Sequence, residues 1–239
     1  MRKVTPYNSS DSKKKQLIQM FDNIAGSYDF LNHSLSFGLD NVWRKIAIQK
    51  LTNNPATILD IATGTADFAI SAAKHTNAKI IGVDISQGML TIGKQKIVKK
   101  KLEDRICLEL ADCENLPFNE GSFDAITAGF GVRNFEDLNK GLSEMYRTLK
   151  AGGIVVILEP STPKYFPIKQ LYNLYFHHIL PTIGGWVSKD KKAYSYLPDS
   201  VDAFPARDNF INELEKVGFK KGKHIPLTFG IVSLYMAIK

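Results

Sequence analysis

Short apolar segments that alternate with helical patterns through the middle of the chain constrain its fold most strongly. Segments of strand character lie at 56–62, 79–85, 105–111, 122–128 and 154–160. Helical patterns lie at 65–74, 89–101 and 135–150, the last expected to end at Gly152-Gly153. Apolar strands that alternate with helices are typical of a parallel sheet covered on both faces. We therefore predict an α/β fold with a doubly wound, mostly parallel, Rossmann-like sheet.

The two ends of the chain depart from this alternation. Apolar residues at helical spacing predict further helices at 12–26, 41–51 and 207–219. Two strands follow the last helix, at 223–230 and 231–239. They are joined through Gly230 like a hairpin, so we expect the sheet to end in an antiparallel strand.

An aromatic-rich insertion lies between residues 161 and 206, where Tyr172, Tyr175 and Phe176 share one helical face. Two interpretations stay open: ordinary core packing, or a lid over a hydrophobic substrate. We expect a single domain over 1–239, with its N-terminal helices within 12–51 and this insertion.

The amino-acid composition limits the classes of binding partner but does not identify one of them. The 239 residues carry a net charge of +7, which suits nucleic acid, an anionic membrane surface or an acidic ligand. No apolar run approaches the roughly 20 residues that span a bilayer, and no signal peptide is visible, so we expect a cytoplasmic protein. The two cysteines, Cys107 and Cys113, have no metal-binding partners at a suitable spacing, so we predict no metal site.

Polar residues and a glycine follow the first three strands of the predicted sheet, where doubly wound folds bind ligands. Gly64 lets the backbone turn sharply and approach a ligand, and Thr65 is placed to cap the following helix. Asp84 follows the second strand, the usual place for an acid that binds ribose hydroxyls. Asp112 follows the third strand and could accept a hydrogen bond from an exocyclic amine.

The first loop argues against a dinucleotide. It has one glycine where the dinucleotide pattern G-x-G-x-x-G has three, and Asp60 and Asp67 place carboxylates nearby. Two negative charges fit a pyrophosphate poorly and an amino-acid ammonium well. We therefore predict S-adenosylmethionine as the cofactor and disfavour an NAD-dependent oxidoreductase.

At this point the chain resembles a family. Motifs similar to those of class I methyltransferases are "LDIATGTADF", "VDISQGML" and "LPFNEGSFDAIT". Further motifs resemble the quinone C-methyltransferases of menaquinone and ubiquinone biosynthesis: "SYDFLNHSLSFG", "FGVRN", "LKAGGIVVILE" and "SYLPDSV". The resemblance extends from about residue 15 to residue 239.

The resemblance and the strand-end pattern together imply a set of cofactor-binding residues. These are Asp60, Thr63, Gly64, Thr65, Asp84, Met89, Asp112, Cys113 and Gly129. The chain departs from the family at Ala62-Thr63, where a Gly-Gly or Cys-Cys pair is frequent, and at Cys113, where alanine is frequent. Neither change removes a needed donor or acceptor.

The implied reaction is C-methylation of demethylmenaquinol to menaquinol, the last step of menaquinone biosynthesis. The alternative is C-methylation of 2-methoxy-6-polyprenyl-1,4-benzoquinol in ubiquinone biosynthesis. In the stretch "AITAGFGVRNF" (125–135), Gly129 and Gly131 are expected to leave room for the flat ring.

Three residues are candidates for the chemistry on that ring. Arg133 would stabilise the phenolate, Asn134 would orient the ring or a water, and Tyr28 would hydrogen-bond a quinol oxygen. Structural alternatives stay open for each. Arg133 could pair with Glu136 or Asp137, Asn134 could cap the 135–150 helix, and Tyr28 could be a core residue.

The expected partners are a prenylated naphthoquinol and, transiently, an anionic membrane surface. The prenyl tail would stay in the bilayer, and the lid and the basic exterior suit docking on the inner face of the membrane. No nucleic acid is expected, because "GFGVRN" stands where amino-methylating enzymes carry an Asn/Asp-Pro-Pro-aromatic motif. A homodimer is possible.

Overall fold

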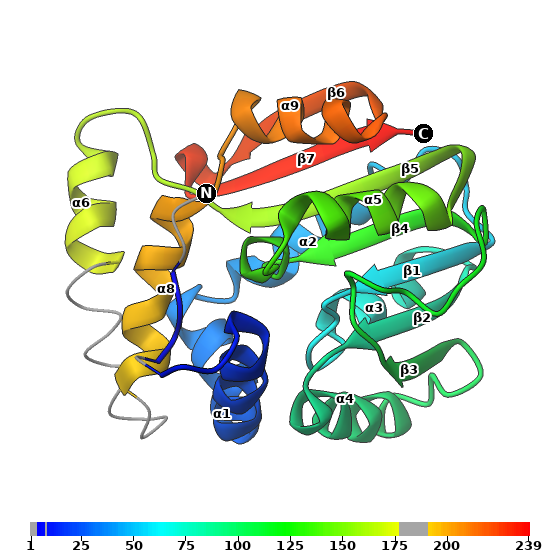
Figure 1. The fold of residues 1–239 in the computed structure, drawn as a ribbon, viewed down its shortest axis with the longest axis horizontal. Coiled ribbons are helices and arrows are strands. Elements are labelled where there is room, and N and C mark those ends of the chain that lie inside the picture. Colours follow the sequence, from blue (N-terminus) through cyan, green and yellow to red (C-terminus); the bar gives the residue numbers. More distant parts are fainter. Residues whose placement is uncertain (1–3, 8, 177–190) are drawn as a thin grey trace.

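The structure is a computed structural model that describes residues 4–7, 9–176 and 191–239. Its centre is a seven-stranded sheet with the order β3-β2-β1-β4-β5-β7-β6 (Figure 1). The strands are β1 (Thr57–Ile61), β2 (Lys79–Asp84), β3 (Ile106–Leu110), β4 (Phe123–Gly129), β5 (Leu149–Pro160), β6 (Lys220–Leu227) and β7 (Val232–Ile238). The strand order reverses beside β1, so ligands are expected at the carboxyl ends of β1 and β4.

Strand directions confirm the predicted mostly parallel sheet. β1 to β5 pair in parallel, and β7 pairs antiparallel with both β5 and β6. β1 lies in the interior of the sheet, with Leu59 opposite Ile81 on one side and Ile126 on the other. The hairpin-like ending that the sequence indicates therefore supplies the single reversed strand.

Helices cover both faces of the sheet, as expected. They are α1 (Lys13–Leu35), α2 (Leu39–Ile48), α3 (Asp67–His75), α4 (Gln87–Lys99), α5 (Leu138–Thr148), α6 (Ile168–Leu174), α8 (Lys191–Ala203) and α9 (Asp208–Val217). Neighbouring residues of β1 serve opposite faces: Ile58 packs in the cluster of α2, α3 and α4, and Leu59 in the cluster of α5 and α9. This alternation divides the apolar core into two layers.

The segment between β4 and β5 differs from the prediction at both ends of its helix. A 3-10 turn (Val132–Asn134) follows β4, and α5 is capped by Asp137, whose side chain accepts from the Lys140 N–H. Asn134 is therefore not the helix cap. The predicted stop at Gly152-Gly153 is also wrong, because α5 ends at Thr148 and β5 begins at once through pairing of Leu149 with Phe123.

A third apolar cluster lies beyond the carboxyl ends of the parallel strands, where α1, α6 and α8 gather (Figure 1). It combines Leu17, Met20 and Ile24 of α1 with Tyr172 and Tyr196 from the aromatic insertion. α1 continues to Leu35, well past the predicted 12–26, and its later residue Leu31 belongs to the same cluster. Residues 177–190, part of the predicted lid, lie outside the described residues.

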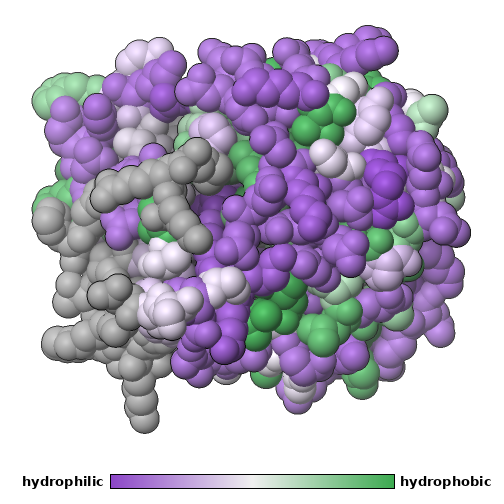
Figure 2. Space-filling model, in the orientation of Figure 1, coloured by the Kyte–Doolittle hydropathy of each residue, from purple (hydrophilic) through white to green (hydrophobic). Residues whose placement is uncertain are grey.

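The surface shown in Figure 2 is mainly hydrophilic, and apolar side chains appear there in small patches. Within the part of the chain that the structure describes, no helix has both the length and the apolar character to cross a membrane.

Candidate active site

A cavity lies at the carboxyl ends of β1, β2 and β4, where the reversal of strand order predicts a ligand. Many of the predicted cofactor residues line it: Gly64, Asp84, Met89, Asp112, Cys113 and Gly129. Tyr28 and Asn134 line it as well.

Asp84 joins the first two strand-end loops on one wall of this cavity. Its Oδ2 accepts from the Gly64 N–H at 2.8 Å and its Oδ1 from the Ser86 N–H at 2.9 Å. Gly64 has φ +53°, the left-handed region that glycine enters readily. Burial raises the pKa of Asp84, and these N–H donors oppose that rise. Since a carboxylate offers about four acceptor positions, Asp84 still has capacity for ligand hydroxyls.

A second acidic group, Asp112 with Glu114, lies just after β3. The sequence analysis predicted Asp112 and missed Glu114. Asp112 and Glu114 share the ammonium of Lys14 from α1, at 2.6 and 3.1 Å. Glu114 is buried, and its Oε1 also accepts from the N–H groups of Glu136 and Asp137. The one sequence signal for Glu114 is a second acid two residues after Asp112; nothing local singles out Lys14.

Three predicted cofactor residues lie behind the cavity wall. The Asp60 carboxylate is fully buried and accepts from the Thr63 and Thr127 hydroxyls, each at 2.6 Å. The Thr65 hydroxyl donates to Asp29 of α1. Thr65 does not cap the next helix, because Ala66 occupies that position in a left-handed conformation. The side chains of these three residues support the loop instead of facing the cavity.

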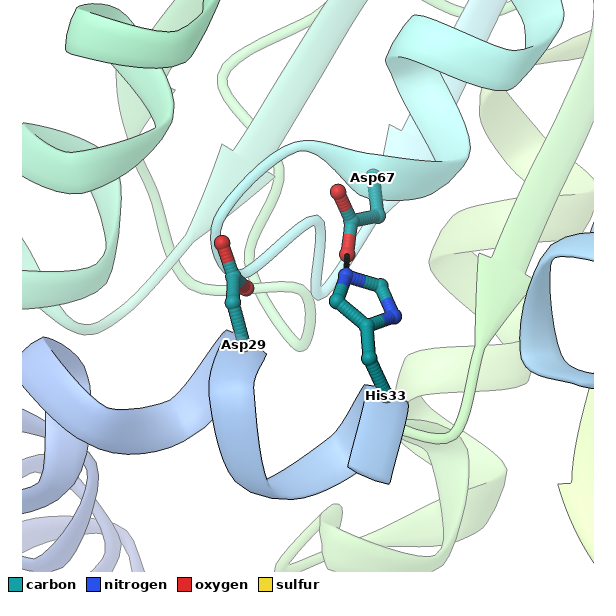
Figure 3. Close-up of side chains that lie close together, drawn as sticks. All are labelled: Asp29, His33 and Asp67. Atoms are coloured by element: carbon teal, nitrogen blue, oxygen red, sulfur yellow. Dashed lines mark ion pairs between the residues drawn. The ribbon is translucent and has the colours of Figure 1, made fainter. Parts of the chain in front are cut away.

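Asp29, His33 and Asp67 converge beside this loop, two from α1 and one from the start of α3 (Figure 3). Their ligand atoms lie within 4.8 Å of one another, close enough to hold a metal ion. The ammonium of Lys96 already binds both carboxylates, and His33 Nε2 lies 3.4 Å from Asp67 Oδ2. The cluster is therefore a charge network that joins α1, α3 and α4.

Gly129 ends β4 and Gly131 follows it in the next turn, and both lie close against neighbouring side chains. A Cβ at Gly129 would lie 2.8 Å from the Phe68 side chain, and one at Gly131 would lie 2.5 Å from the Ala62 Cβ. The space that a side chain would need is therefore filled by protein. The absent side chains let β4 and the turn after it pack closely against Phe68 and Ala62, and both glycines line the first cavity. That they leave room for a substrate ring stays a prediction.

A second cavity, of about 280 Å³, opens beside the first. Its walls are mainly apolar and aromatic, with Met20, Trp43 and Phe176 among them. The residues that line both cavities are Phe21, Tyr28, Phe130 and Asn134. The two cavities therefore meet at one junction.

Arg133 lines the second cavity beside this junction, and its ion pair differs from the predicted alternatives. Its Nη1 is 2.9 Å from Glu159 Oε2, and its backbone N–H donates to Glu159 Oε1. It is not paired with Glu136 or Asp137. Its Nε donates to the Ser200 hydroxyl and Nη1 also to the Phe130 carbonyl, while Nη2 has no partner among the described residues. Burial raises the pKa of Glu159, and the guanidinium of Arg133 opposes that rise.

Asn134 and Tyr28 complete the polar end of the second cavity. The Tyr196 hydroxyl donates to Asn134 Oδ1 at 3.0 Å, which leaves the amide NH₂ for a ligand. Burial raises the pKa of Tyr28, and the charge of Arg133 partly opposes this. Tyr28 therefore stays protonated near neutral pH and can donate a hydrogen bond.

Comparison with known proteins gives the family. The pattern of the ubiE/COQ5 methyltransferase family matches residues 9–239. The chain belongs to this family. It is 49% identical to the demethylmenaquinone methyltransferase of Bacteroides fragilis over 99% of this chain and 98% of that protein. It is 48% identical to the ubiquinone/menaquinone biosynthesis C-methyltransferase UbiE of Geotalea daltonii over 95% of this chain and 97% of that one.

Solved structures confirm the fold. A putative S-adenosylmethionine-dependent methyltransferase from Methanococcus maripaludis aligns with a TM-score of 0.64 at 22% identity, covering 98% of this chain and 96% of that one. A phosphoethanolamine N-methyltransferase from Haemonchus contortus, in complex with S-adenosylmethionine, aligns with a TM-score of 0.59 at 18% identity, covering 82% and 52%. The family member described here is thus an S-adenosylmethionine-dependent methyltransferase. Its acid-lined cavity suits the ammonium and ribose of that cofactor.

The buried Asp60 carboxyl generates a pH prediction. Burial raises its pKa from 3.8 to about 6, although hydrogen bonds from Thr127 and Thr63 favour the charged form. The unfolded chain loses this proton at a lower pH than the folded protein. The contribution of Asp60 to stability is therefore fully present below about pH 4 and is lost as pH rises through about 6, a change of ~3 kcal/mol.

Urea unfolding of the wild type and of Asp60→Asn between about pH 4 and 7 checks this, since other titrating groups cancel in the difference. The free energy of unfolding of the wild type should fall relative to the variant as pH rises. A difference that stays constant with pH contradicts the assignment.

Proposed function

We propose that this protein transfers a methyl group from S-adenosylmethionine to a ring carbon of demethylmenaquinol, giving menaquinol. The observation that carries the proposal is the junction of the two cavities at Phe21, Tyr28, Phe130 and Asn134. A flat ring in the second cavity would lie with its reacting edge toward the cofactor. The names of the relatives in Bacteroides fragilis and Geotalea daltonii indicate that the substrate is a quinone precursor.

The second cavity suits a quinol head group with an apolar tail. Its walls carry apolar side chains such as Met20, Ile24 and Trp43, and polar groups gather at the junction. An arrangement of this kind fixes the orientation of a ligand through few polar contacts while apolar walls bury the rest. The quinol oxygen would lie at the polar end, and the prenyl tail would leave through the apolar end.

The role of the polar end is to increase the nucleophilicity of the ring. Donation from Arg133 Nη2 and from the Asn134 amide to the quinol oxygen favours its deprotonated form, which raises electron density at the adjacent ring carbon. Arg133 keeps its proton, so it does not act as the base, and the hydroxyl proton passes to water. The ring carbon that receives the methyl group then loses its own proton to water, which restores the aromatic ring, and the ring oxygen regains a proton. S-adenosylmethionine supplies the electrophilic methyl group on its sulfonium, so the proposal includes no metal.

The substrate assignment is tested by anaerobic turnover of the purified protein. We expect a methyl group on the ring carbon of a short-chain demethylnaphthoquinol, identified by mass spectrometry. The oxidised naphthoquinone is the matched control and should not react, because its carbonyl oxygens have no proton to lose.

A 2-methoxy-6-prenyl-1,4-benzoquinol tests the alternative substrate, because the name of the Geotalea daltonii relative includes ubiquinone as well as menaquinone biosynthesis. Faster turnover of this benzoquinol would favour the ubiquinone reaction. Methylation of neither quinol, or methylation on oxygen, would contradict the proposal.

We further propose that the protein docks reversibly on the inner face of an anionic membrane. Phe37 lines the second cavity and is 82% exposed. Phe229 is 75% exposed and follows Thr228, whose hydroxyl accepts from Trp43 Nε1 in the cavity wall. Apolar side chains beside the cavity, together with a net charge of +7, suit insertion among anionic lipids. Nucleic acid is not among the proposed partners, and a homodimer is compatible with this arrangement.

Vesicle co-sedimentation tests the membrane proposal. The protein should bind vesicles that contain phosphatidylglycerol at low salt and bind neutral vesicles weakly. Phe37→Ser with Phe229→Ser should weaken binding about tenfold or more, since each ring loses its burial in lipid. Val98→Ser, which changes an exposed apolar residue of α4, is the control and should bind normally. No affinity for anionic vesicles at low salt would overturn the proposal.

A further inference from the structure

The Tyr172 hydroxyl is a polar group that the fold buries without a partner among the described residues. Tyr172 belongs to α6, is 6% exposed and lines the second cavity. Its ring stacks on that of Phe176, with centroids 4.8 Å apart and an interplanar angle of 18°. The ring therefore has a packing role, and the hydroxyl has none that the described contacts explain.

The other tyrosines around this cavity have partners for their hydroxyls. Tyr175 donates to the Leu35 carbonyl at 2.9 Å, and Tyr196 donates to Asn134 at 3.0 Å. Tyr28 has a hydrogen bond with Asn32 that favours its charged form. A buried hydroxyl without a hydrogen-bond partner makes a protein less stable than phenylalanine at the same position would. A tyrosine at position 172 is therefore explained if a bound ligand supplies the hydrogen-bond partner of its hydroxyl.

The position of Tyr172 indicates which ligand atom that partner is. Arg133 and Tyr172 both line the second cavity, but they come from different elements: Tyr172 from α6 and Arg133 from the turn after β4. A hydroquinone carries two oxygens at opposite ends of its ring. If one oxygen binds Arg133 and Asn134, the second must meet another wall of the same cavity.

Resting on the proposed function, we infer that the Tyr172 hydroxyl binds the second quinol oxygen, the one para to the oxygen held by Arg133 and Asn134. Tyr172 is then a specificity-determining residue that selects 1,4-dihydroxy rings over rings with a single hydroxyl. Burial raises the pKa of Tyr172 well above its usual value, so its hydroxyl stays protonated and can donate or accept.

Two substrates and two variants test this inference. The substrates are a short-chain demethylnaphthoquinol and the matching 1-naphthol, which keeps the hydroxyl beside the reacting carbon and lacks the para hydroxyl. Tyr172→Phe removes the hydroxyl and retains the stacked ring. Tyr175→Phe is the matched control, because its hydroxyl lies in the same cavity wall but already donates to the backbone.

We expect Tyr172→Phe to lower kcat/KM for the quinol about tenfold, mainly through KM, and to leave the naphthol rate unchanged. The preference for quinol over naphthol should therefore shrink about tenfold in Tyr172→Phe and stay as in the wild type in Tyr175→Phe. The electronic effect of the missing hydroxyl is the same in all three proteins and cancels in this comparison. Affinity for S-adenosylmethionine should not change.

Thermal unfolding separates this role from a structural one. Tyr172→Phe should unfold at the wild-type temperature or above, because the hydroxyl it removes has no partner in the described structure. A lower unfolding temperature, or an equal loss of rate with both substrates, would overturn the inference. A wild type that methylates neither quinol would instead overturn the proposed function, so the two failures are distinguishable.

Discussion

The ion pair between Arg133 and Glu159 is the interaction on which the polar end of the second cavity, the proposed substrate site, depends. Arg133 is 8% exposed and Glu159 fully buried, so neither charge could stay in place without the other. Glu159 also accepts from the backbone N–H of Arg133, which fixes the turn after β4 and with it Asn134. Glu159 of β5 thus fixes the position of Arg133 and Asn134, which lie in the turn after β4. Because the pair is nearly neutral, Arg133 can act on a quinol oxygen mainly through directed hydrogen bonds.

α1 has the corresponding role on the cofactor side. Lys14 binds Asp112, Asp22 accepts from the Ser86 hydroxyl and the Gly88 N–H, and Asp29 binds Lys96. These contacts fix α1 across the ends of β2 and β3. The same helix brings Tyr28 to the junction of the two cavities. One helix therefore joins the wall of the first cavity to that of the second, which we propose for the substrate, and alignment is a major source of rate enhancement in group transfer.

The sequence predicted those features that local patterns determine. Apolar alternation predicted the parallel sheet, and acids at strand ends predicted Asp84 and Asp112 on the cavity wall, because both depend on short-range periodicity and strand direction. The pairing of Arg133 with Glu159 joins residues distant in sequence, and the local alternatives, Glu136 and Asp137, were wrong for that reason. The same limit applies to α1, whose long-range ion pairs gave no signal in its lysine-rich start.

The double variant Arg133→Met with Glu159→Gln tests the central claim most directly, because it removes the cation without leaving a buried charge unpaired. Cofactor affinity, measured by calorimetry, should stay within about threefold of the wild type, since neither side chain lines the cofactor cavity. The kcat for the quinol should fall about 100-fold or more. A kcat near that of the wild type would contradict the account.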